Sequence, residues 1–114
     1  MKNDQTLSQA NNLKDNIIKW RRHLHQNPEL SFEEHETVQF VKEKLEKLNF
    51  EIDYPVAKTG LVATLRGNTE GPTVAIRADM DALPIQEESD VEYKSTVEGV
   101  GHLCGHDAHT AILL

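Results

Sequence analysis

The densest group of side chains that could do chemistry lies near the C-terminus of the 114-residue chain, in residues 101–109. It holds three of the six histidines and the single cysteine. Cys104 and His106 are two residues apart, which places both side chains on one side of an extended segment. A thiolate and an imidazole so placed could share a zinc ion, with manganese, cobalt or nickel as alternatives. A C-x-H pair also recurs by chance, so the spacing leaves both interpretations open.

The pattern excludes two other uses of cysteine and histidine. A zinc finger requires a second ligand pair, and a covalently attached haem requires C-x-x-C-H; the sequence has neither. One cysteine also excludes an intramolecular disulfide.

A second candidate group is the pair Asp79 and Asp81, which follow the apolar residues 73–77. If the chain stays extended, the two carboxylates point the same way and repel each other unless a cation or a donor lies between them. The carboxyl ends of strands are also where α/β sheets bind ligands. Two solvated acids in a turn are the alternative. Because this pair precedes the cysteine and histidine by about 25 residues, the two groups together predict half of a metal site.

The third candidate is the basic segment 21–25. His23 and His25 do not share a helical face, since residues two apart diverge. We interpret both as groups at a helix end that favour the negative end of the helix dipole. Trp20 is assigned to the core.

Hydrophobic spacing predicts the elements that position these residues. A helix is expected over residues 7–26, where Asn27 and Pro28 end it. A second helix is expected from Ser31, capped reciprocally by Ser31 and Glu34, to about Asn49. Strands are expected over residues 50–54, 61–66 and 73–77, with a weaker one over 92–96, and a last helix over 107–114 with Asp107 as its N-cap. The predicted fold is α/β, with two helices packed on a mixed sheet of three or four strands.

Composition bounds the class of protein. The chain has room for one domain, with 38% hydrophobic and 27% charged residues. The net charge of −7 lies entirely in residues 70–114, which argues against a nucleic-acid partner. No apolar run approaches the ~20 residues of a membrane span, and the first residues do not resemble a secretory signal, so we expect a cytoplasmic protein. The apolar residues 111–114 predict the N-terminal piece of a larger fold, with a complete small domain as the alternative.

Four motifs together resemble the amidohydrolase branch of the M20 metallopeptidase family. They are RHLHQNPEL at 22–30, Glu36-Thr37, RADMDALP at 77–84 and HLCGHDAHTAILL at 102–114. This branch includes aminoacylase-like, hippurate hydrolase-like, N-acetyldiaminopimelate deacetylase-like and auxin-conjugate hydrolase-like enzymes. The resemblance implies that residues 1–114 are the N-terminal part of a zinc-exopeptidase-like catalytic domain, without its remainder and without the lid or dimerisation domain.

The resemblance also implies roles for single residues. Cys104 and His106 fall on positions that ligate a two-metal centre. Asp81 falls on a catalytic-site carboxylate that orients a histidine ligand, and Asp79 stands where sister branches have that histidine. Inside the last motif, His102, Asp107 and His109 are given supporting or capping roles.

The chemistry that the resemblance implies is hydrolysis of the amide bond of N-acyl amino acids or related conjugates. Paired divalent metals (Zn, Mn, Co or Ni) polarise the carbonyl and activate water, and a glutamate acts as general base. In family members that glutamate and the other ligands lie beyond residue 114. We therefore expect a small-molecule substrate, homo-oligomers at full length, and no activity for these 114 residues alone. The alternative is a non-enzymatic domain that weakly binds metal or a partner protein.

Overall fold

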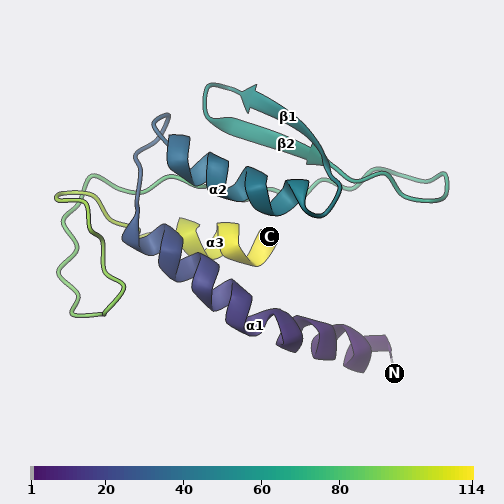
Figure 1. Cartoon of the computed structure of the whole chain (residues 1–114), viewed down its shortest axis with the longest axis horizontal. Helices are drawn as coiled ribbons and strands as arrows, with labels where there is room; N and C mark the ends of the chain where they lie inside the picture. Colours follow the sequence, from purple (N-terminus) through teal and green to yellow (C-terminus); the bar gives the residue numbers. More distant parts are fainter. Residues whose placement is uncertain (1) are drawn as a thin grey trace.

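The structure is a computed structural model that describes residues 2–114. Its helices and strands are α1 (Lys2–Gln26), α2 (His35–Glu46), β1 (Glu51–Val56), β2 (Gly60–Thr64) and α3 (His106–Leu113). Figure 1 shows α3 alongside α1, with α2 between these helices and the hairpin. The predicted α/β class is therefore confirmed.

Helix α1 ends where the sequence predicts. Its last residue is Gln26, and the side-chain amide of Asn27 donates to the backbone carbonyl of His23 at 2.8 Å. Toward this end the helix is anchored by Leu24, of which 2% is exposed. Trp20 is half-buried rather than fully enclosed. The helix also begins earlier than predicted, at Lys2.

Helix α2 begins later than predicted, at His35, and the expected capping box over residues 31–34 does not form. No side chain at the N-cap position bonds the first turn. The carboxylate of Glu29 does so instead, because it accepts from the backbone N–H of Glu36 at 3.1 Å and of Thr37 at 2.6 Å. The cap of this helix is thus supplied from the turn before it, and not by the residues that its spacing suggested.

Strands β1 and β2 form an antiparallel hairpin, with Glu51 opposite Thr64 and Asp53 opposite Val62. The hairpin packs against α2. Its turn is tied to the start of α2, because the buried hydroxyl of Thr59 donates to the carboxylate of Glu34.

The predicted third strand over residues 73–77 is wrong, and so is the mixed sheet. In the described chain the only sheet is the two-stranded hairpin, and no backbone hydrogen bond pairs residues 73–77 with another segment. Val74 and Ile76 are 79% and 75% exposed. A β-prone sequence forms a strand only where a neighbouring strand completes the ladder, and residues 2–114 do not place one there. The weaker strand at 92–96 is also absent, since turns occupy that part of the chain.

The core is small and lies where the helices meet the segment after residue 78. Its buried apolar residues are Leu24, Val38, Val41, Ala82 and Ala111. Isolated β-bridges join Leu30 to Ala82 and Leu83 to Gly101, which fixes residues 79–84 beside the start of α3. In residues 2–114, no helix combines the length and apolar character of a membrane span.

Candidate metal centre

Helix α3 positions the candidate site. It begins at His106, and its N-cap is Gly105 in the left-handed region at φ 96°, a conformation that suits glycine. Asp107 lies in the first turn rather than at the N-cap, so the predicted capping role is wrong. No side chain caps this eight-residue helix locally. Such a short helix gains little stability alone, so its placement depends on tertiary contacts.

The imidazole of His106 is oriented by Asp81. Its Nδ1 lies 2.9 Å from the Oδ1 atom of Asp81 and 3.0 Å from the same residue's backbone oxygen. Both of these atoms are acceptors, so Nδ1 must carry the proton and donate it. The lone pair of His106 is then at Nε2, which is the arrangement of a metal-binding histidine held by a carboxylate.

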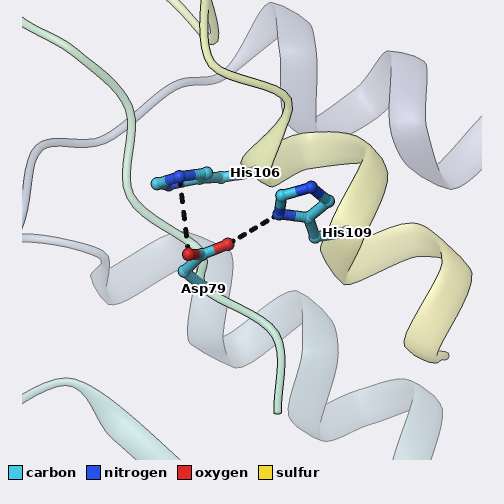
Figure 2. A group of neighbouring side chains, drawn as sticks. All are labelled: Asp79, His106 and His109. Carbon is cyan, nitrogen blue, oxygen red and sulfur yellow. Dashed lines mark hydrogen bonds and ion pairs between the residues drawn. The ribbon is translucent and has the colours of Figure 1, made fainter.

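The carboxylate of Asp79 lies between two imidazoles, as Figure 2 shows. Its Oδ2 atom is 3.4 Å from Nε2 of His106, and its Oδ1 atom is 2.8 Å from Nδ1 of His109. The hydroxyl of Thr110 donates to the backbone oxygen of Asp79 at 2.9 Å, which fixes this segment against α3. The three residues each offer a ligand atom, and these atoms lie within 4.8 Å of one another.

Asp79 is held in its charged form. The hydrogen bond from His109 lowers the pKa of Asp79, and it outweighs burial, which opposes this shift. A carboxylate and two imidazoles form a donor set that suits zinc and related divalent cations. The residues present therefore fit part of a metal site.

The structure brings together some of the predicted site residues and not others. Asp81 and His106 are in direct contact. Cys104 is exposed and lies outside the group formed by Asp79, His106 and His109. The sequence left the role of Asp79 open and gave His109 only a supporting role, whereas in the structure both belong to the group. Their spacing gave a signal, because His106 and His109 are three residues apart and share a helical face.

Beneath this group, Asp107 is enclosed by α1. Its side chain is fully buried, and its Oδ2 atom accepts from Nε of Arg21 at 2.8 Å and lies 2.7 Å from Nδ1 of His25. The other ring nitrogen of His25, Nε2, lies 2.8 Å from Oε1 of Glu87. We call Arg21, His25, Glu87 and Asp107 the buried ion cluster.

The carboxylates of the buried ion cluster are charged. Burial alone would raise the pKa of Glu87, but hydrogen bonds from the Ser89 hydroxyl, the Ser95 backbone N–H and His25 lower it to about 2. For Asp107 burial likewise opposes ionisation, but the hydrogen bond from His25 and the charge of Arg21 lower the pKa.

Nearby, burial lowers the pKa of His102, whose Nε2 atom has no hydrogen-bond partner in the described structure.

Sequence reasoning missed this cluster, because it assigned His25 only to the helix end and gave Glu87 no role. One signal was available: Arg21 and His25 are four residues apart and so share a helical face. No spacing in the sequence relates either of them to Asp107, which is 82 residues beyond His25.

Comparison with known proteins identifies relatives. Residues 75–114 match the model of peptidase family M20/M25/M40. The chain is 54% identical over 103 residues to thermostable carboxypeptidase 2 of Saccharolobus solfataricus, covering 90% of this chain and 26% of that protein. It is 55% identical over 103 residues to the N-acyl-L-amino acid amidohydrolase of Geobacillus stearothermophilus, covering 90% of this chain and 28% of that protein. The chain thus spans about a quarter of the length of these relatives.

Solved structures agree with these matches. The YxeP protein of Bacillus subtilis, described as a dinuclear metal-binding peptidase of the M20 family, superposes with a TM-score of 0.81 at 50% identity over 85% of this chain and 27% of its own. A candidate aminohydrolase from methicillin-resistant Staphylococcus aureus superposes with a TM-score of 0.92 at 41% identity, over 97% of this chain and 30% of its own.

Proposed function

We propose that this chain belongs to peptidase family M20/M25/M40, a family of hydrolases, and that it forms part of the divalent-metal centre of an amidohydrolase. The proposed substrates are N-acyl amino acids and related conjugates, whose amide bond is hydrolysed. The observation that carries the proposal is the orientation of His106, with Nδ1 held by Asp81 and Nε2 directed at the Asp79 carboxylate.

Asp79, His106 and His109 are the residues that would hold a metal ion in this structure. We also propose Cys104 as a ligand, on the basis of its C-x-H spacing and of the family resemblance. Its side chain is exposed and would have to join Asp79, His106 and His109 for that role. A relative described as dinuclear supports a site for two metal ions. Cobalt, manganese, zinc and nickel all suit such a mixed donor set.

Each residue of the site has a task that follows from its contacts. A bound divalent cation would polarise the scissile carbonyl and make a water molecule more acidic. Asp81 keeps the proton of His106 on Nδ1, so that Nε2 offers its lone pair. Asp79 supplies negative charge that balances a cation, and Thr110 holds its backbone in place. His109 holds the Asp79 carboxylate from its other oxygen.

Metal binding by the 114-residue chain tests the proposal. Equilibrium dialysis against Zn²⁺ is expected to show saturable binding that His106→Ala removes. His35→Ala is a matched control, because His35 is exposed at the start of α2. Equal binding by the wild type and by His106→Ala would overturn the proposed centre.

Turnover is measured with the same preparations. N-acetyl amino acids are supplied with Zn²⁺, Mn²⁺ or Co²⁺, and a Cys104→Ala chain is compared. The remaining family ligands lie outside these residues, so we propose that the chain alone has little or no turnover. Turnover above the Cys104→Ala control would overturn that part of the proposal.

The alternative function is a non-enzymatic domain that binds a partner. The exposed side chains of Val74 and Ile76 favour it, because apolar surface of this kind often marks an interaction site. Metal-dependent turnover by the chain would rule out this alternative.

A further inference from the structure

We propose that His25 is a positioning residue for the metal centre, which acts by clamping Asp107 and so fixing the first turn of α3. The inference rests on the proposed function, because it assigns His25 a role toward His106. Its basis is independent of the resemblance and lies in the contacts of the buried ion cluster.

His25 connects two carboxylates that come from distant parts of the chain. Nδ1 lies 2.7 Å from Asp107 and Nε2 lies 2.8 Å from Glu87, and just 4% of the residue is exposed. A ring nitrogen must carry a proton to bond a carboxylate, so both nitrogens donate and the ring is an imidazolium. With Arg21 it supplies two positive charges for two carboxylates, which is how a buried cluster of this kind avoids an uncompensated charge.

The surroundings of His25 hold the ring in one orientation. Its edge packs against the ring of Tyr93 with the centroids 5.4 Å apart. Glu87 is held by Ser89 at 2.5 Å and by the backbone N–H of Ser95 at 2.6 Å. His25 also lies in the last turn of α1, where the helix dipole favours a positive charge.

The clamp acts on the metal centre through the geometry of α3. Asp107 directly follows His106, so the two side chains leave the helix about 100° apart. Fixing Asp107 against α1 therefore fixes the rotation of the first turn and the direction of His106. Opposite this contact, Asp81 holds the first turn through His106, and Thr110 of the next turn donates to the backbone oxygen of Asp79.

The helix offers no cap of its own at the start of α3. Its N-cap is a glycine, and no side chain caps its first turn. Loss of His25 would leave Asp107 buried with Arg21 as its remaining charged partner, a costly state that the helix relieves by shifting. Such a shift moves His106 Nε2 away from Asp79, from which it is now 3.4 Å.

The experiment is a Co²⁺ titration of the full chain, followed by the visible absorption of the bound ion. The variants are His25→Gln and, as a matched control, His23→Gln, whose ring stacks on Phe40 away from Asp107. We expect His25→Gln to raise the Kd for Co²⁺ by at least about tenfold and to change the absorption bands. His23→Gln is expected to match the wild type. The same Kd and bands in His25→Gln and the wild type would overturn the proposal.

A second variant and a metal-free measurement guard against ambiguous results. If His25→Gln fails to fold by far-UV circular dichroism, Arg21→Gln decides, because this partner is partly exposed and its loss is milder. A wild type that binds no Co²⁺ contradicts the proposed function instead.

Amide hydrogen exchange of the metal-free chain then tests the contact of His25 with Asp107 alone. His25→Gln must speed the exchange of the His109 amide in α3 and leave that of Val38 in α2 unchanged. Unchanged exchange at His109 would overturn the clamp.

Discussion

At the scale of single residues, the chemistry of the site depends on which nitrogen of His106 holds the proton. Asp81 decides this, because both atoms that it presents to Nδ1 are acceptors. The sequence predicted the pair Asp81 and His106 but could not predict their contact, since 25 residues separate them. It also could not show that Asp79 faces the same ring.

Asp81→Asn tests this control of the proton. An amide can present its NH2 group to Nδ1 and favour the wrong tautomer, so we predict a 10- to 100-fold loss of Zn²⁺ affinity. Isothermal titration calorimetry measures it. Asp53→Asn, on the exposed side of β1, is the control and is expected to bind as the wild type does. An Asp81→Asn chain with wild-type affinity contradicts the orienting role.

Cys104 offers a separate test, because its thiol is exposed. The free chain is expected to react readily with iodoacetamide, and saturating Zn²⁺ is expected to slow the reaction several-fold if the thiolate is bound. Mass spectrometry of the alkylated chain gives both rates. Alkylation at the same rate with and without Zn²⁺ would remove Cys104 from the proposed ligands.

At the scale of elements, the helices were predictable, whereas the starts of α1 and α2 were not. The apolar spacing and the Asn27-Pro28 pair predicted the end of α1 correctly. The start of α2 was wrong, because a carboxylate from outside the expected motif, that of Glu29, bonds its first turn. The local sequence shows which residues could cap a helix. Which residue does so depends on the segments that the tertiary structure places beside the first turn.

Glu29→Gln tests this cap. The charged oxygen atoms bond two backbone N–H groups and complement the helix dipole, so its loss is predicted to lower the free energy of unfolding by about 1 kcal/mol. Urea unfolding followed by circular dichroism measures the change. Glu33→Gln, at an exposed position four residues later, is expected to have little effect. Equal losses in the two variants would show that Glu29 has no special role.

The carboxylate of Glu87 makes the stability of the folded chain depend on pH. The pKa of Glu87 is lowered from 4.5 to about 2 in the folded chain, where hydrogen bonds outweigh burial. The folded state therefore gains stability from this carboxylate above pH 4.5 and loses it as the pH falls toward 2. Urea unfolding at several pH values is expected to show a steeper loss below pH 4.5 in the wild type than in Glu87→Gln. Parallel curves for the two chains would contradict the lowered pKa.

At the scale of the whole molecule, the sheet differs most from the prediction. Residues 73–77 have the composition of a buried strand, but Val74 and Ile76 are exposed because residues 2–114 place no neighbouring strand beside them. The α/β class followed from hydrophobic spacing and the resemblance to the M20 family from motifs, whereas the pairing of strands depends on contacts between distant segments. The buried ion cluster could not be predicted for the same reason, because it joins Arg21 to Asp107, which are 86 residues apart.

The exposed apolar residues predict how the chain behaves in solution. We expect it to bind an apolar fluorescent dye and to self-associate as its concentration rises, because Val74 and Ile76 are both exposed and lie two residues apart on one segment. The double substitution Val74→Lys and Ile76→Lys is expected to reduce both effects. Fluorescence titration and analytical ultracentrifugation measure them. Dye binding that the substitutions leave unchanged would place the apolar surface elsewhere.

We expect His106 to bind a divalent cation through Nε2 while Asp81 holds Nδ1. The most direct test is ¹⁵N NMR of the histidine rings of the full chain during a titration with Zn²⁺. We predict that the Nε2 signal of His106 shifts on binding while Nδ1 keeps its proton. A His106 ring that is unchanged when Zn²⁺ is bound would show that His106 is not a ligand.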